Sequence, residues 1–85
     1  MKRIEVIPIA EKKAKQRNIP IEWIVETLKA PLQVVEGYGD RKIAHMKYCI
    51  ESKEYLLRVV FEENEEAYIV VTAYLTSQCE RYWRK

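Results

Sequence analysis

The sequence predicts an α+β domain in which two N-terminal helices pack on one face of a four- to five-stranded, mainly antiparallel sheet, with a short C-terminal helix. Three observations support this prediction. Apolar side chains recur at helical spacing over residues 21–28, the pattern over residues 42–75 is that of strands, and the links between the expected strands are short and polar. A chain of 85 residues has room for one core, so we expect a single domain over residues 1–85.

The first elements are expected to be a short strand and a helix. Ile4 and Val6 alternate with their neighbours in the manner of a strand, which is expected to stop at Pro8. A first helix follows over residues 9–17, and its apolar face is thin. The stripe that this helix would bury consists of Ala10, Ala14 and Arg17.

The second helix is better marked, because its apolar residues fall at i, i+3, i+4 and i+7, the spacing of one buried stripe. Pro20 suits its first turn. The helix must end near Lys29, since Ala30 precedes Pro31 and the residue before a proline is pushed out of the α region. Trp23 lies off the stripe, so it either widens the buried face or is partly exposed. The stripe consists of Ile21, Ile24, Val25 and Leu28.

Strands account for most of the remaining chain. They are separated by a turn at residues 37–40 and by polar links at residues 51–53 and 62–66, which fit antiparallel neighbours. The N-terminal strand is expected to join one edge of this meander. The four expected strands cover residues 32–36, 42–50, 54–61 and 68–75.

A short helix is expected near the C-terminal end. Ser77 and Glu80 have the spacing of a capping box, in which each side chain satisfies an otherwise unpaired backbone N–H. The helix would carry residues 81–85. Because so short a helix is marginal alone, it must dock on the rest of the domain.

The composition excludes several classes of protein. Nearly half of the residues are apolar and a third are charged, with two Gly and three Pro, which is typical of a globular chain and not of a disordered or fibrous one. The first apolar run is short and is interrupted by Glu5, and no later run approaches a membrane span. We therefore expect a cytoplasmic protein with no membrane partner.

The cysteines do not suggest a disulfide framework or a zinc ribbon, because Cys49 and Cys79 are far apart and neither belongs to a C-x-x-C pair. On a strand, His45 and Cys49 would lie about 13 Å apart. That distance is too great for two ligands of one zinc ion. We expect neither a metal nor a cofactor.

The net charge of +2 is unevenly distributed. Residues 1–19 carry six basic side chains against two acidic ones, whereas four acidic residues cluster within residues 62–66. One interpretation is a solvated helix face and a solvated hairpin tip. The other is a basic surface that suits a nucleic acid or an acidic protein, with the acids held at the far end. The residues that would then bind a nucleic acid are Lys12, Lys13, Arg17, Arg41, Arg81 and Arg84.

One face of the expected sheet gathers polar and charged side chains, because alternate residues of a strand point to opposite faces. In the strand over residues 42–50, His45 and Lys47 fall on the face away from the helices. Arg58 is assigned to the same open face, since a charge buried under the helices would be costly unless it were paired. In the last strand Ile69, Val71, Ala73 and Leu75 are assigned to the core, and Tyr68, Val70, Thr72 and Tyr74 to the open face.

This face could serve phosphate chemistry. An arginine is a forked, permanently charged clamp, and a His or Lys can move a proton if its pKa lies near neutrality. A base could take the proton of a ribose 2′-OH while Arg58 stabilises charge on the phosphorus oxygens. Alternatively, His45 is merely solvated and Tyr74 is a cross-strand packing partner. The candidate catalytic residues are Arg58, His45, Lys47 and Tyr74.

Several short motifs run through residues 9–75. In the helical part they are Ala10, Lys13, Arg17-Asn18-Ile19, Ile24-Val25 and Leu28-Lys29-Ala30-Pro31. In the strands they are Arg41, Leu57-Arg58-Val59-Val60-Phe61 and Val70-Val71-Thr72-Ala73-Tyr74. By these motifs the chain resembles DUF4258, an uncharacterised family of small prokaryotic domains at the margin of the RelE/ParE toxin superfamily. The chain departs from the family's commonest pattern in two places, with Ile9 instead of a histidine and Asn18 instead of a glycine.

The resemblance implies a RelE-like β-α-α-β-β-β(-β) fold. Toxins of this fold cleave mRNA, often on the ribosome, or bind DNA gyrase, and a partner antitoxin silences them. The ribonucleases among them tend to use several basic residues and a tyrosine near the end of the chain. Arg58, Lys47, His45, Tyr74 and Arg81 could fill such roles.

Three hypotheses follow. The first is a toxin-like mRNA endoribonuclease, ribosome-associated or free, with an antitoxin covering the open face. The second is a non-catalytic module that binds a protein or a nucleic acid, which the modest net charge of +2 favours. The third is a homodimeric domain whose open face is the interface. The apolar residues of that interface would be Leu56, Val60 and Val70, together with Tyr74.

Overall fold

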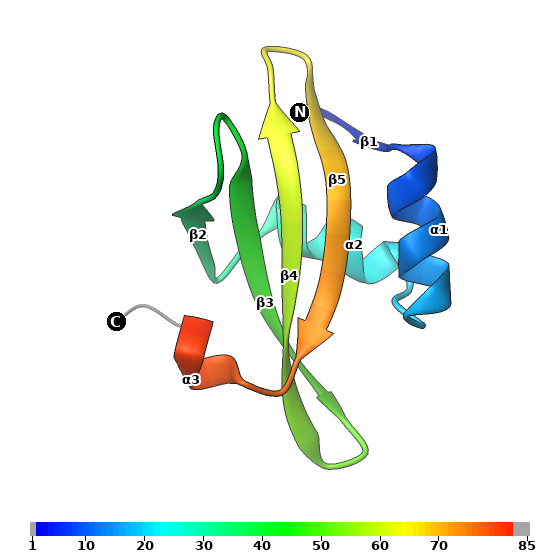
Figure 1. The fold of residues 1–85 in the computed structure, drawn as a ribbon, viewed down its shortest axis with the longest axis vertical. Coiled ribbons are helices and arrows are strands. Elements are labelled where there is room, and N and C mark those ends of the chain that lie inside the picture. Colours follow the sequence, from blue (N-terminus) through cyan, green and yellow to red (C-terminus); the bar gives the residue numbers. More distant parts are fainter. Residues whose placement is uncertain (1, 83–85) are drawn as a thin grey trace.

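The computed structural model describes residues 2–82, and two helices precede a run of strands along this part of the chain (Figure 1). The order agrees with the sequence prediction, and most boundaries agree within one or two residues. The elements are β1 (Arg3–Val6), α1 (Pro8–Gln16), α2 (Ile21–Lys29), β2 (Gln33–Glu36), β3 (Lys42–Ile50), β4 (Lys53–Glu63), β5 (Ala67–Thr76) and α3 (Cys79–Tyr82).

The strands form one five-stranded sheet in the order β1-β5-β4-β3-β2. Strands β2 to β5 are an antiparallel meander, as predicted, but β1 runs parallel to β5, with Arg3 opposite Ala67 and Val6 opposite Val70. The sheet is therefore mixed, and the prediction of a mainly antiparallel sheet is corrected. The alternation of Ile4 and Val6 identifies a strand but carries no information about its direction.

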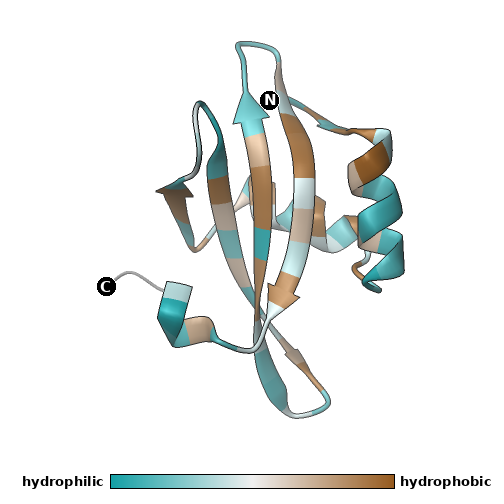
Figure 2. Ribbon diagram, viewed as in Figure 1, coloured by the Kyte–Doolittle hydropathy of each residue, from teal (hydrophilic) through white to brown (hydrophobic). Residues whose placement is uncertain are grey.

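Helices α1 and α2 cover one face of the sheet, and α3 lies on the other side (Figure 1). The buried stripe of α1 consists of Ala10 and Ala14, as predicted, whereas Arg17 is exposed. In α2 the stripe is shifted, because Ile21 is 38% exposed and Thr27 is fully buried. Figure 2 shows hydrophilic residues on the outer side of α1 and at the hairpin tips, and mainly apolar ones along β4. The core between the layers includes Ile24, Leu28, Ala44, Leu57, Val59 and Ala73.

Trp23 widens the buried face of α2. It is half-buried, and its ring is stacked on that of Tyr48 with centroids 4.2 Å apart. The Tyr48 hydroxyl donates to Glu26 Oε1 over 2.9 Å. Burial and this hydrogen bond raise the pKa of Tyr48 to about 12. The pair therefore ties α2 to β3 by an aromatic stack and a hydrogen bond.

A β-bulge divides β5. Val60 pairs with Thr72 but Phe61 pairs with Val70, so that Val71 has no partner of its own. The extra residue reverses the facing of the strand before it. Val70 is fully buried in the core, and the Tyr68 ring packs edge-on against Phe61. The assignment of Tyr68 and Val70 to the open face, with Ile69 and Val71 in the core, is therefore wrong, whereas Ala73 and Leu75 lie on the core side as predicted.

The C-terminus of α1 explains why an asparagine can replace a glycine there. Asn18 has a φ of 56°, in the left-handed region that favours glycine and, after it, asparagine. The N–H of Ile19 donates to the Ala14 carbonyl over 2.8 Å, and the N–H of Asn18 to the Lys15 carbonyl over 3.2 Å. These are the two hydrogen bonds of a Schellman motif, and they turn the chain sharply into α2.

Two of the four acidic residues at the β4–β5 tip, Glu62 and Glu63, are engaged in local ion pairs. Glu62 accepts from Arg41 Nε over 3.1 Å, and Glu63 contacts Lys2 and, over 3.9 Å, Lys42. The hydrogen bond from Lys2 lowers the pKa of Glu63 below its usual value. Basic and acidic residues are thus neighbours at this end of the sheet.

Among the helices of residues 2–82, none combines the length and apolar character that a membrane crossing requires.

Candidate functional site

Four side chains form a row across four strands, on the face of the sheet that α1 and α2 leave uncovered. The strand register places Gln33 of β2 opposite His45 of β3, His45 opposite Arg58 of β4, and Arg58 opposite Tyr74 of β5. Directly opposite residues of neighbouring strands point to the same face. The structure therefore brings together three of the predicted catalytic residues, His45, Arg58 and Tyr74.

Hydrogen bonds connect this row from end to end. Arg58 donates its Nε–H to Nε2 of His45 over 3.0 Å, and its Nη1–H to the Tyr74 hydroxyl. On the other side of the imidazole, the amide of Gln33 lies 2.6 Å from Nδ1. We refer to Gln33, His45, Arg58 and Tyr74 as the polar row.

The arginine determines the tautomer of the histidine. A guanidinium N–H can only donate, so Nε2 of His45 must accept and the ring proton lies on Nδ1. The amide nitrogen of Gln33, which donates to the Tyr82 carbonyl oxygen over 3.0 Å, is the Gln33 atom that lies next to Nδ1. A protonated ring would direct an N–H at the Arg58 N–H, and it is therefore disfavoured.

His45 is not open to solvent, in contrast to the sequence prediction. Its side chain is fully buried. Burial lowers the pKa of His45 to about 4, and the positive charge of Arg58 acts in the same direction. At neutral pH the ring is therefore uncharged, and it serves as a hydrogen-bond acceptor for Arg58.

The cover over this part of the face is α3. The guanidinium carbon of Arg58 lies 3.9 Å from the centroid of the Tyr82 ring and 5.3 Å from that of Tyr74. The amide of Gln33 lies 3.0 Å from the Tyr82 carbonyl oxygen. The predicted docking of the C-terminal helix is thus observed, and Arg58 is half-buried between two tyrosine rings.

Sequence reasoning missed Gln33 and Tyr82. Gln33 could have been found only from the register of β2 with β3, which one sequence does not give. Tyr82 had a signal, because the family resemblance implies a tyrosine near the end of the chain and Tyr82 fits that description as well as Tyr74 does. The prediction names Tyr74 and not Tyr82.

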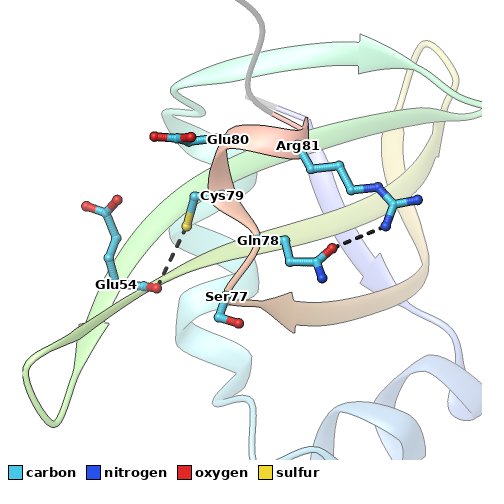
Figure 3. A pocket seen from close by; sticks show the side chains of 6 residues that line it. All are labelled: Glu54, Ser77, Gln78, Cys79, Glu80 and Arg81. Carbon is cyan, nitrogen blue, oxygen red and sulfur yellow. Dashed lines mark hydrogen bonds between the residues drawn. The ribbon is translucent and has the colours of Figure 1, made fainter.

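A hollow of about 530 Å³ lies beside α3, lined by Glu54 and residues 77–81 (Figure 3). Cys79 Sγ is 3.8 Å from the Glu54 carbonyl oxygen, and Arg81 donates to Gln78 Oε1 over 3.2 Å.

Helix α3 begins at Cys79, so the residue directly before it is Gln78. The predicted capping box, which requires Ser77 at that position with Glu80, is therefore not formed. Thr76 Oγ1 instead accepts the N–H of Gln78 over 3.1 Å. Trp83, Arg84 and Lys85, which the prediction included in this helix, lie outside the described residues.

Lys47, the fourth predicted catalytic residue, lies one row away from the polar row. It is opposite Leu56, and two residues along a strand separate it from His45. Its side chain is exposed as predicted, with Nζ 4.0 Å from Glu54 Oε1.

Leu56, one of the apolar residues expected at a dimer interface, is fully buried. Because Leu56 and Val70 are both buried, the apolar surface expected for a dimer interface is not present in the predicted form.

The predicted nucleic-acid-binding residues do not form one surface. Lys12 and Lys13 lie on α1, on the other side of the sheet from Arg58. Arg17 covers the edge of β5, where Nη1 donates to the Ala73 carbonyl over 2.8 Å. Arg41 lines a hollow over the next row of residues along the strands, and Arg81 belongs to α3, on the same side of the sheet as the polar row (Figure 1). Arg84 lies outside the described residues.

A second hollow of about 460 Å³ adjoins the polar row. Its floor consists of Ile43, Val60 and Thr72, which are the next row of opposite residues on the same face. Tyr38 and Arg41 stand at its rim. Within residues 2–82, no three His, Cys, Asp or Glu side chains gather closely enough to hold a metal ion.

Comparison with known proteins matches most of this chain to a family. The family described as Domain of unknown function (DUF4258) matches residues 10–75, which include the whole polar row. No curated protein and no solved structure matches the chain significantly.

Proposed function

This chain belongs to the DUF4258 family, and we propose that it is a toxin-like endoribonuclease that binds an RNA phosphate at Arg58. The observation that carries the proposal is the fixed guanidinium of Arg58. It is held at the centre of a sheet face by the Nε2 acceptor of His45 and the hydroxyl of Tyr74. A flexible surface lysine is enough for loose electrostatic binding. A preorganised arginine is what stabilisation of a phosphorane-like transition state needs.

The Arg58 guanidinium retains donors for a phosphate. Its Nε and one N–H of Nη1 are used within the polar row, whereas no described residue accepts a hydrogen bond from Nη2. The side chain is half-buried, where a charge-assisted hydrogen bond is stronger than in bulk water. The Tyr82 ring lies against the guanidinium, so a phosphate would approach past α3.

In the proposed reaction, the ribose 2′-oxygen attacks the adjacent phosphorus and the bond to the 5′-oxygen breaks. The products are a 2′,3′-cyclic phosphate and a 5′-hydroxyl end. The exposed Lys47 is our candidate for the base that takes the 2′-OH proton, and the Tyr74 hydroxyl for the group that gives a proton to the leaving oxygen. His45 is assigned a positioning role, because its buried, neutral ring orients Arg58.

A second candidate is a non-catalytic module that binds RNA or protein on the same face. The burial of His45 favours it, since the histidine that sequence analysis proposed as a proton carrier does not reach solvent. Under the first proposal, the partner that silences the protein would be an antitoxin covering the polar row.

A cell-free translation reaction tests the proposal. Wild type, Arg58→Ala and a matched control, Arg3→Ala, are added separately, and new 5′-hydroxyl ends on the message are mapped. Arg3 is an exposed arginine of β1, whose side chain contacts Glu5 and not the polar row. Each variant is first shown to be folded by circular dichroism and a cooperative urea transition.

We expect new 5′-hydroxyl ends with wild type and with Arg3→Ala, and at least a hundred-fold fewer with Arg58→Ala, the loss that removal of one key transition-state donor produces. A Lys47→Ala variant should lose cleavage while it still binds RNA. Intact message with wild-type protein, together with measurable RNA binding, would reject cleavage and leave the binding module. Equal cleavage by Arg58→Ala would reject the role of the polar row.

A further inference from the structure

The hollow above the polar row has features that suit a flat, aromatic ligand. Its floor is formed by the side chains of Ile43, Val60 and Thr72, and the ring of Tyr38 stands at its rim. We propose that this hollow is a subsite for one unpaired nucleobase of single-stranded RNA, next to the phosphate bound at Arg58. The inference rests on the proposed RNA-directed function and specifies how the RNA is held.

The distance between the two positions fits one nucleotide. Val60 lies two residues along β4 from Arg58, and both point to the face opposite α1 and α2. Two residues of a strand span about 7 Å. A nucleotide whose phosphate contacts Arg58 can therefore reach the hollow with its base without any change in the sheet.

Tyr38 is placed to close such a subsite. Its side chain is 95% exposed, so its ring contributes little to the packing of the fold. Its backbone is nevertheless fixed, because Gly37 N–H donates to the Arg41 carbonyl over 2.9 Å and Arg41 N–H to the Tyr38 carbonyl over 3.1 Å. A ring on a fixed turn loses little freedom when a base stacks on it, and every base offers a π-face to such a ring.

The charges around the hollow also suit a nucleotide. Arg58 lies two residues along β4 from Val60 of the floor, and Arg41 lines the hollow itself, where its Nε donates to Glu62. The two guanidinium groups could contact successive phosphates on either side of one base. Glu36 lines the same rim, where its carboxylate could accept a hydrogen bond from an exocyclic amino group of the base. A nucleotide within a single strand has a flat base for the apolar floor and phosphates for the two arginines, so it is the class of ligand that fits this hollow.

The test uses two seven-nucleotide strands that are abasic at every position except the central one, which is 2-aminopurine in one strand and abasic in the other, so that no flanking base can enter the subsite. All ribose 2′-hydroxyls are replaced by 2′-O-methyl groups, so that no cleavage occurs. Binding is measured by anisotropy of an end label, and stacking by quenching of the 2-aminopurine. The full chain is used as wild type, Tyr38→Ala, Tyr38→Phe and Arg58→Ala.

We expect wild type to bind the 2-aminopurine oligonucleotide about ten-fold more tightly than the abasic one, the effect of one stacked base, with quenched fluorescence. Tyr38→Ala should lose that difference and Tyr38→Phe should keep it. Equal affinity of wild type for both oligonucleotides, or unchanged discrimination in Tyr38→Ala, overturns the subsite. Discrimination that survives in Arg58→Ala, at unchanged affinity, would retain the base subsite and reject the phosphate clamp of the proposed function.

Discussion

Arg58 donates its Nε–H to Nε2 of His45 over 3.0 Å, between the neighbouring strands β4 and β3 of the sheet. The arginine is oriented by this hydrogen bond and by the Tyr74 hydroxyl, and the histidine is kept neutral by its burial and by the arginine. The two residues therefore depend on each other. Their coupling can be measured without knowledge of any substrate.

The first prediction concerns the titration of His45. It is the single histidine of the chain, so its ring signals in an NMR spectrum need no assignment. Because the ring is buried beside a guanidinium, we expect its titration midpoint at about pH 4 in the folded protein. A midpoint near the ordinary value of about 6.5 would contradict the burial of His45.

The second prediction concerns Arg58→Gln, which removes the positive charge next to the imidazole. The pKa of His45 should rise from about 4 toward its ordinary value, since one of the two causes of its depression is lost. The same NMR titration measures the shift. Arg3→Ala, which also removes one positive charge, should leave the midpoint where it is in wild type.

The third prediction concerns stability at acidic pH. Above about pH 6.5 the ring is neutral in both the folded and the unfolded chain. Between about pH 6.5 and pH 4 the unfolded chain binds a proton that the folded chain does not, so the free energy of unfolding falls as the pH falls. Once this fall is complete, the free energy of unfolding is lower by about 3 kcal/mol. Urea titrations at pH 7 and pH 4 should show this fall in wild type and a smaller one in His45→Gln, while equal falls would refute it.

The fourth prediction tests the β-bulge. Val70 is fully buried and Val71 is the extra, half-buried residue. Val70→Ala should therefore lower the free energy of unfolding by about 2 kcal/mol, as expected for a small cavity in the core. Val71→Ala should cost less than half of that amount. Urea denaturation of the two variants measures the difference, and the opposite order would restore the simple alternation that sequence analysis assumed.

The fifth prediction concerns the turn after α1. Asn18 has a φ of 56°, which a residue with an ordinary side chain tolerates poorly. Asn18→Ala should destabilise the protein by about 1 kcal/mol, whereas Asn18→Gly should be neutral within about 0.5 kcal/mol. Thermal denaturation followed by circular dichroism compares the two. A loss of stability in Asn18→Gly as large as that in Asn18→Ala would argue against the left-handed conformation.

The sequence predicted the elements well where local patterns decide them. The stripe of Ala10 and Ala14, the proline that ends α2 and the polar links between strands all depend on neighbours within a few residues. The polar row was partly predicted for the same reason, because alternation along β3 and β4 is regular and places His45 and Arg58 on one face. Three of its members, His45, Arg58 and Tyr74, were identified with the correct facing, although His45 is buried and not exposed.

The errors concern contacts between residues far apart in the chain. Residues 67–75 are mostly apolar, so the pattern could not reveal that Val71 is an extra residue in the pairing of β5 with β4. The two neighbours of His45 in the polar row, Gln33 and Arg58, contact Tyr82 of α3, and no local feature of residues 42–50 encodes that docking. The parallel direction of β1 likewise depends on its partner β5, which follows more than sixty residues later.

The pairing of β1 with β5 also affects how the chain can fold during synthesis. The first strand leaves the ribosome early, but its partner, Ala67–Thr76, is made near the end of the described chain. The antiparallel hairpins of β2 to β5 can form one after another, whereas the β1 edge must wait, and such long-range pairings form slowly. Strand β5 is the partner of β1 and the strand on which α1 packs, and it also carries Tyr74 of the polar row. A nascent chain without β5 lacks all three of these features. Neither the complete sheet nor the complete polar row can therefore exist before translation has passed Thr76.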